Sequence, residues 1–256
     1  MFGLLFGLLE ELVAQEFEVM LLEGKHVVVI GGSQGIGYQT ARLARQSGAE
    51  VTIVGRSLSK LDEASERLGK VHTAVADITD EAAINCLFTT IEQVDHVYIA
   101  AGSFVGGQIL EGSVEQFRPA IESRLWGSVY VIRAAVPKMV SSGSVTLTGG
   151  LSTERPVPGA WVTAVATAAA EQLSRALALE LAPIRVNAVS PGWTDTPMWD
   201  AIFGESKPQA FQEVTSKIPT RRLATAEEVA SSVIFLMTNS SITGEVIHID
   251  GGHRYV

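Results

Sequence analysis

The chain has 256 residues, of which 46% are hydrophobic and 18% charged, so it can bury a sizeable core and we expect no disordered tails. Its net charge is −9 and it has no basic run to neutralise phosphates, so we expect no nucleic-acid partner. The single cysteine, Cys86, cannot form an internal disulfide, which fits a reducing cytoplasm.

Residues 1–19 differ in pattern from the rest of the chain. Their apolar run ends at Glu10 and Glu11, too short to span a membrane, and they lack the features of a secretory signal. Apolar residues at helical spacing predict an amphipathic helix, and its four glutamates disfavour an anionic membrane surface, which leaves protein docking or self-association. The alternative is a non-native or disordered leader before a start near Met20, with one domain over 20–256.

From residue 25 onward, short β-branched runs alternate with longer helical patterns. The predicted strands are His26–Ile30, Glu50–Val54, Val71–Ala76, Asp95–Ile99, Ser144–Thr148, Ile184–Val189 and Val246–Ile249. The predicted helices are Gly35–Ser47, Leu58–Leu68, Asp80–Ile91, Val114–Val140 and Trp161–Leu181, and a capping box at Thr225 opens another. This alternation, with nearly continuous apolar strands, predicts a Rossmann-type α/β domain: a doubly wound parallel sheet with helices on both faces.

The first strand is followed by a glycine-rich turn, GGSQGIG, over residues 31–37. Glycine permits a tight turn and close backbone approach, and the helix that follows presents free N–H groups to a pyrophosphate. Because the turn lies between a buried strand and a helix, it predicts a dinucleotide site; the alternative is a tight turn without a ligand. The candidate residues here are Gly31, Ser33, Gln34, Gly35, Ile36 and Gly37.

The second strand ends at Gly55-Arg56-Ser57, where a chain that binds NAD would carry an acidic residue. No carboxylate is there to repel a 2′-phosphate, and Arg56 offers a planar, permanently charged fork to bind one. We therefore expect NADP(H), preferred over NAD(H), with Arg56 and Ser57 in its site. The alternative for Arg56 is a solvated surface arginine.

Residues 21–256 resemble the short-chain dehydrogenases/reductases along their whole length. The resemblance rests on the GGSQGIG turn, Asp77-Ile78, Ala101-Gly102, the segment IRVNAVSPGWTDT from Ile184 to Thr196, and the ending from Thr243 to Gly252. It implies a seven-stranded parallel sheet and a homo-oligomer, a dimer or more commonly a tetramer. It also places the Asp77-Ile78 position at the adenine and Ala101-Gly102 beside the cofactor, with the nicotinamide amide held by Pro191, Gly192, Trp193 and Thr196.

The resemblance fails at the catalytic residues. The family uses Asn, Ser, Tyr and Lys, and the lysine-tuned tyrosine exchanges a proton with the substrate oxygen. Counting from the flanking motifs puts Arg124 at the position of the family's asparagine and Gly150 at that of its serine, with Thr148 and Ser152 close by. The same count puts Thr163 at the position of the tyrosine and Thr167 at that of the lysine. No tyrosine lies between Tyr130 and Tyr255, and no lysine between Lys138 and Lys207, so no shifted alignment restores the set.

The candidate catalytic residues are therefore Arg124, Ser152, Thr163 and Thr167, and no metal is expected. A threonine hydroxyl is too weak an acid to replace the tyrosine, whereas a guanidinium can stabilise a developing alkoxide although it cannot give up its proton. The alternative for Arg124 is an ion pair on a helix surface, and for the three hydroxyl residues it is packing.

The segment Pro197–Pro219 carries Met198, Trp199, Phe203 and Phe211 without a strand pattern. A long apolar insertion after a cofactor strand predicts a lid over an apolar substrate; the alternative is ordinary packing or a subunit contact. Glu154 and Arg155 are further polar candidates at the rim of the pocket.

Three functions remain in competition. The leading hypothesis is an NADP(H)-dependent oxidoreductase that transfers a hydride to or from a small apolar carbonyl or alcohol with non-standard catalytic residues. The rival is a catalytically impaired NADP(H)-binding sensor or partner subunit, because all four usual residues are absent. The third is a lyase or isomerase that uses the pocket without net redox change.

Overall fold

The computed structural model describes residues 21–256, so the leader predicted at 1–19 lies outside the described residues. Seven parallel strands form one sheet in the order β3-β2-β1-β4-β5-β6-β7. The strands are β1 (His26–Ile30), β2 (Glu50–Gly55), β3 (His72–Val75), β4 (Val94–Ile99), β5 (Met139–Thr148), β6 (Arg185–Pro191) and β7 (Val246–Ile249). The order reverses between β1 and β4, and ligands of such sheets bind outside the carboxyl ends of the strands at that point.

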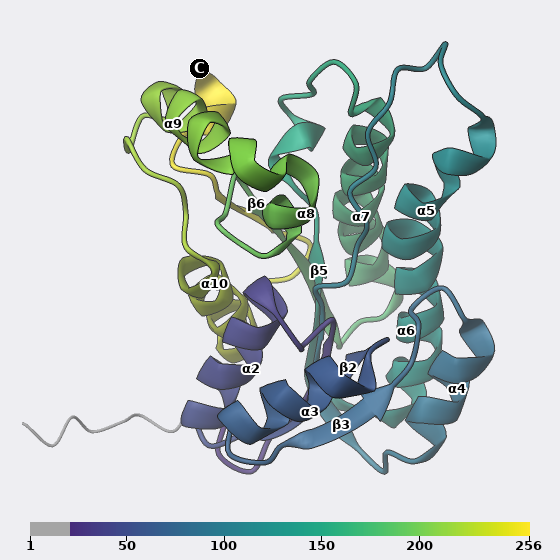
Figure 1. Ribbon diagram of the computed structural model, residues 1–256. Coiled ribbons are helices and arrows are strands. Elements are labelled where there is room, and N and C mark those ends of the chain that lie inside the picture. The colour runs from purple at the N-terminus through teal and green to yellow at the C-terminus, as the bar shows by residue number, and fades with distance from the viewer. Residues whose placement is uncertain (1–20) are drawn as a thin grey trace, which may run out of the picture.

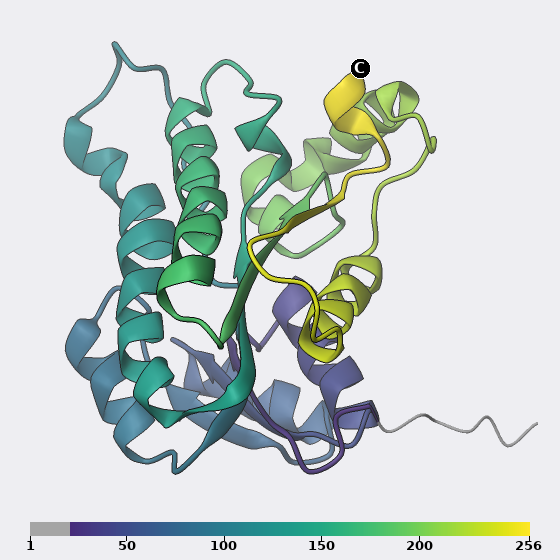
Figure 2. The same ribbon diagram turned by 180° about the vertical axis from the view of Figure 1, so that it is seen from behind.

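The helices cover both faces of the sheet (Figures 1 and 2). The α-helices are α2 (Gly35–Gln46), α3 (Leu58–Arg67), α4 (Glu81–Thr89), α5 (Arg118–Ile121), α6 (Gly127–Ala135), α7 (Trp161–Glu180), α8 (Met198–Phe203), α9 (Lys207–Lys217) and α10 (Ala226–Thr238). Helices α2, α3 and α10 lie on one face, and α4 to α7 lie on the other. The predicted doubly wound α/β fold is confirmed.

The core has one layer on each side of the sheet, because β1 and its neighbours bury apolar side chains on both faces. Val27 and Val29 of β1 pack into the layer under α2 and α10, while Val28 and Ile30 pack into the layer under α4 and α6. Every residue of β4 is buried. Strands covered on both faces read as continuous apolar runs, which is why their positions could be predicted from the sequence.

The segment predicted as one helix, Val114–Val140, is divided in the structure, and that prediction was wrong. It consists of a 3₁₀ turn (Val114–Gln116), α5, a π-helical turn (Glu122–Trp126), α6 and a second 3₁₀ turn (Val136–Lys138), after which β5 begins at Met139. Pro137 has no N–H to continue α6, so the helix ends at Ala135. Met139 then pairs with Val94 of β4, five residues before the predicted start of the strand.

The predicted lid, Pro197–Pro219, contains α8 and α9 and lies at the carboxyl edge of the sheet, with the chain's C-terminus beside α9 (Figure 1). Lys207 at the start of α9 bridges Asp195 Oδ1 at 2.8 Å and Asp200 Oδ1 at 2.7 Å. This double ion pair ties α9 to α8 and to the turn after β6. Over residues 21–256, no helix has both the length and the apolar character to cross a membrane.

Candidate active site

The glycine turn between β1 and α2 leaves no room for side chains. A Cβ on Gly37 would lie 2.1 Å from Gly31 O, and a Cβ on Gly31, whose φ is +89°, would lie 2.9 Å from Ala101 N. Gln34 precedes α2 without a side-chain hydrogen bond, and the first turn of the helix carries no acidic residue. The first N–H groups of α2 thus lack a side-chain acceptor, so the turn fits the pyrophosphate of a dinucleotide.

The adenine end of the predicted cofactor site is formed where β2 and β3 end. Arg56 Nη1 lies 3.7 Å from Asp77 Oδ2, and the Arg56 side chain is 76% exposed. Partial burial raises the pKa of Asp77, but hydrogen bonds from Thr79 N and Oγ1 and the charge of Arg56 outweigh it and hold that pKa below its ordinary value. Ser33 belongs to the same end, since a Cβ on Gly55 would lie 3.7 Å from its Oγ.

The other end of the predicted site is formed after β4 and β6. Ala101 N donates to Ile30 O at 3.0 Å, which holds the Ala101-Gly102 turn beside β1. A Cβ on Gly35 would lie 3.3 Å from Thr196 Cγ2, so the segment after β6 reaches back to the glycine turn. The structure therefore brings the residues predicted for the two ends of a cofactor to one edge of the sheet.

Arg124 lies in the π-helical turn, and its guanidinium lies between the carboxyl ends of β4 and β5. Its Nη1 donates to Thr148 O at 3.2 Å, and its Cζ would lie 2.7 Å from a Cβ on Gly102. Its Nε is buried and has no hydrogen-bond partner within residues 21–256. Burial lowers the pKa of Arg124 to about 10, against the opposing effect of Tyr98, so the side chain stays a cation at neutral pH. The alternative of a surface ion pair does not describe this residue.

The three predicted hydroxyl residues are near one another but have different surroundings. Ser152 Oγ lies 3.4 Å from Thr167 Oγ1, and a Cβ on Gly150 would lie 3.9 Å from Ser152 Oγ. Thr167 Oγ1 also donates to Thr163 O at 3.0 Å. The Thr163 hydroxyl donates to Val105 O at 3.0 Å and accepts from Val105 N at 3.1 Å, so it fastens the segment after β4 to α7.

Comparison with known proteins identifies the family. A family model described as Enoyl-(Acyl carrier protein) reductase matches residues 30–254. The short-chain dehydrogenase/reductase malC of Malbranchea aurantiaca is 31% identical over 252 residues, covering 91% of this chain and 95% of its own. The chain belongs to the short-chain dehydrogenase/reductase family. Another member with a similar sequence, the 3-oxoacyl-[acyl-carrier-protein] reductase FabG of Chlamydia muridarum, is 32% identical, covering 91% of this chain and 98% of its own.

Solved structures of short-chain dehydrogenases/reductases share the fold. The MalC reductase/Diels-Alderase from Malbranchea aurantiaca has a TM-score of 0.88 at 29% identity, over 93% of this chain and 100% of that one. A small-chain dehydrogenase in complex with NADPH has a TM-score of 0.80 at 31% identity, over 91% of this chain and 99% of that one. The fold is shared with a structure that holds NADPH, and the cradle formed by the glycine turn fits a nicotinamide dinucleotide.

Two polar residues beside this site were missed by the sequence reasoning. Glu171 Oε1 accepts from Gly150 N at 3.2 Å and from Thr153 Oγ1 at 3.1 Å. One signal was present: Thr163, Thr167 and Glu171 follow one another at intervals of four and therefore share one face of α7. The position of Thr153 depends on how the turn after β5 meets that face, which no local pattern shows.

The predicted lid and the turn after β6 share an aromatic cluster. Trp193 stacks on Trp199 with ring centroids 4.4 Å apart, and Phe203 lies 5.5 Å from Trp199 in nearly the same orientation. Phe104, from the segment fastened by Thr163, lies 5.9 Å from Trp199. Aromatic contacts therefore join the lid to the segment after β4, and the wall between them is apolar.

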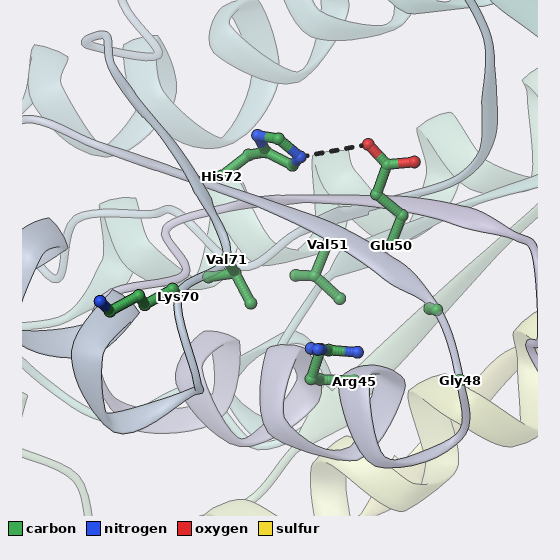
Figure 3. A pocket seen from close by; sticks show the side chains of 8 residues that line it. Arg45, Gly48, Glu50, Val51, Lys70, Val71 and His72 are labelled. Carbon is green, nitrogen blue, oxygen red and sulfur yellow. Dashed lines mark ion pairs between the residues drawn. The ribbon is translucent and has the colours of Figure 1, made fainter.

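Two cavities lie at the opposite edge of the sheet from the glycine turn. The first, of about 290 Å³, is lined by Arg45, Lys70 and His72, whose Nε2 lies 3.3 Å from Glu50 Oε1 (Figure 3). The second, of about 540 Å³, shares Glu50 and His72 with it. No candidate cofactor or catalytic residue lines either cavity, so neither belongs to this site. In the described part of the chain, no cluster of His, Cys, Asp and Glu is suited to a metal ion.

Proposed function

We propose that this chain is an NADP(H)-dependent oxidoreductase that transfers a hydride to or from a small apolar carbonyl or alcohol, with catalytic residues that depart from the family's Asn-Ser-Tyr-Lys set. The observation that carries the proposal is the partly buried Arg124 cation against Gly102, at the carboxyl edge of the sheet. A carbonyl oxygen gains negative charge as the hydride arrives, and a fixed cation stabilises that charge.

The cofactor supplies the hydride when it is bound, and the chain's residues hold and orient it. The glycine turn and the N-terminus of α2 take the pyrophosphate, Asp77 and Ile78 lie at the adenine, and the Ala101-Gly102 turn and the segment from Pro191 to Thr196 hold the nicotinamide. Arg56 is exposed, and its ion pair with Asp77 is long at 3.7 Å, so its guanidinium can also bind a 2′-phosphate, which supports NADP(H) over NAD(H).

The hydroxyl residues take unequal roles in this proposal. Ser152 lies beside the site and exchanges the proton with the substrate oxygen, while Thr167 positions it. Thr163 positions the segment after β4, because both hydrogen bonds of its hydroxyl go to Val105. The aromatic cluster of the lid favours an apolar substrate. We further propose a cytoplasmic homo-oligomer, on the family resemblance and the single cysteine.

Two other functions each have one supporting observation. The full engagement of the Thr163 hydroxyl with Val105 favours a sensor or partner subunit that binds NADP(H) without catalysis. The relative whose structure is called a reductase/Diels-Alderase favours a pocket that also promotes bond rearrangement without net redox change.

The test is NADPH oxidation by the chain with a panel of ketones, aldehydes and enones, with analysis of the products. Arg124→Met should leave NADPH affinity within a few-fold and lower turnover by roughly 10²-fold or more. The matched control is Arg133→Met, an exposed arginine on α6, which should change neither. NADPH binding without oxidation across the panel would favour the sensor, and product formation without NADPH oxidation would favour the lyase or isomerase.

A further inference from the structure

Glu171 is a carboxyl group sealed inside the protein beside the candidate active site. Its side chain is 1% exposed, and Gly149 makes room for it, because a Cβ on that glycine would lie 2.3 Å from Glu171 Oε1. Among the described residues, no lysine, arginine or histidine forms an ion pair with it. An ionised carboxyl group is costly to bury without a cationic partner. The hydrogen bonds of Glu171 therefore determine which chemistry it can take part in.

The contacts of Glu171 lead toward Ser152. Thr153 Oγ1 lies 3.1 Å from Glu171 Oε1 and 3.1 Å from Thr167 Oγ1. Thr167 Oγ1 lies 3.4 Å from Ser152 Oγ. Each hydroxyl both donates and accepts, so the three form a path along which a proton can pass. The other contact of the carboxyl group is the Gly150 N–H, which does not exchange protons in this way.

We propose that Ser152, Thr167, Thr153 and Glu171 form a proton relay that serves the substrate oxygen. This inference rests on the proposed function, because a relay needs an oxygen that gains or loses a proton in the reaction. Ser152 contacts the substrate, and Glu171 is the buried end that stores the proton. The relay does the work for which a single tyrosine would otherwise be needed.

In a carbonyl reduction, each proton transfer along the relay breaks one O–H bond and forms another. The reduced dinucleotide, when bound, would supply the hydride and be oxidised by two electrons. As the new C–H bond forms, the carbonyl π electrons move to oxygen, and the Ser152 O–H bond breaks as the substrate O–H bond forms. Ser152 then takes a proton from Thr167, and Thr167 takes one from Thr153. Thr153 takes the last proton from the Glu171 carboxyl group, which ends as a carboxylate. Thr167 must turn its O–H from Thr163 O toward Ser152 for this step, a rotation about one bond. After product release, the proton returns from solvent along the same path.

The relay is tested by breaking it at the middle and at its buried end. Thr153→Val removes the hydroxyl and keeps the shape, whereas Thr153→Ser keeps the hydroxyl. Glu171→Gln keeps an acceptor for Gly150 N and Thr153 but cannot act as an acid. The matched control is Ser174→Ala, a buried hydroxyl on the same helix that donates only to Glu171 O, at 2.7 Å. The measurements are kcat, KM, NADPH affinity, Tm and the solvent isotope effect on kcat.

We expect Thr153→Val and Glu171→Gln to lower kcat by about tenfold or more, toward the ~10²–10⁴ that a positioned acid contributes, and to change the solvent isotope effect. Thr153→Ser should restore most of the rate, and NADPH affinity should stay within a few-fold. Normal turnover in Thr153→Val and Glu171→Gln would overturn the relay alone, as would an equal loss in Ser174→Ala. A wild-type protein that oxidises NADPH with no member of the panel would overturn the proposed function and the relay together.

Discussion

The guanidinium of Arg124 lies so close to Gly102 that a Cβ added to this glycine would stand 2.7 Å from Arg124 Cζ and 2.8 Å from its Nη1. The obstructing atoms are the far end of a flexible side chain, which can move away while the backbone stays in place. We therefore expect Gly102→Ala to displace Arg124 without unfolding the protein. Turnover should fall by about tenfold or more, a smaller loss than that in Arg124→Met, as measured by steady-state NADPH oxidation.

The control for Gly102→Ala is a double-mutant cycle with Arg124→Met. If the alanine acts by displacing the guanidinium, it should change kcat by no more than about twofold once the guanidinium is gone, because residues in contact are not additive. Equal losses in both backgrounds would show that the alanine acts on the bound cofactor instead.

The second prediction concerns Arg56 and the choice of cofactor. NADPH should bind more tightly than NADH by at least tenfold, about 1.4 kcal/mol, when the two are titrated under the same conditions. Arg56→Asp should reverse that order, since a second carboxylate beside Asp77 would repel the 2′-phosphate. Arg133→Asp, on the opposite face of the sheet, should leave the order unchanged. Equal affinities in the native protein would contradict the assignment to NADP(H).

The sequence predicts the sheet and the glycine turn well because their causes are local. β1 is buried on both faces and carries the apolar run Val27–Ile30, and only glycine fits at Gly31 and Gly37, where backbone atoms crowd the space that a side chain would need. The sequence was misleading over Val136–Val140, whose apolar pattern continues that of α6 although Pro137 ends the helix. There, pairing with β4 overrides the helical periodicity.

The polar part of the site was less predictable because it depends on contacts between distant segments. The sequence left Arg124 open between a surface ion pair and the active site, and only the approach of Gly102 and Thr148 shows where its guanidinium lies. Glu171 lies one turn beyond Thr167 on the same face of α7, but that spacing alone does not identify it as a site residue. Its role follows from Thr153, eighteen residues earlier in the chain, which reaches it only because the turn after β5 packs on α7.

The third prediction concerns the stability of the fold toward acid. Burial lowers the pKa of His96 from its ordinary 6.5 to about 4, although the charge of Asp95 opposes this and those of Arg185 and Lys25 add to it. Above pH 6.5 neither the folded nor the unfolded chain protonates this residue. Between pH 6.5 and 4 the unfolded chain binds a proton that the folded chain excludes. The free energy of unfolding should therefore decrease as the pH is lowered from 6.5 to 4, by about 3 kcal/mol at most.

Chemical denaturation at a series of pH values checks this prediction. His96→Asn keeps an acceptor for the Ser144 hydroxyl, which lies 2.8 Å from His96 Nδ1, and should flatten the slope between pH 6.5 and 4. His72→Gln, at an exposed histidine, should keep the slope of the native protein. An unchanged slope in His96→Asn would assign the acid sensitivity to other groups.

The last prediction concerns Lys207, which joins the predicted lid to the turn after β6 through Asp195 and Asp200 at 2.8 and 2.7 Å and lies 5.1 Å from the centroid of the Phe211 ring. The hydrogen bonds that Lys207 donates to the two carboxylates, together with the charges of those carboxylates, raise the pKa of Lys207, so the pairs persist through neutral pH. Lys207→Met removes both pairs and leaves the aromatic stack to hold the lid alone. Because exposed ion pairs are weak, we expect the KM for substrate to rise only a few-fold, with NADPH affinity nearly unchanged.

Ionic strength separates this effect of Lys207 from a change in packing. Salt screens exposed charges, so added salt should raise the KM of the native protein toward that of Lys207→Met and should leave the KM of the variant unaltered. Lys207→Arg should behave nearly as the native protein, and Lys217→Met, at the other end of α9, is the matched control. If Lys207→Met shows native KM and native salt dependence, then the stack of Trp193, Trp199 and Phe203 sets the position of the lid by itself.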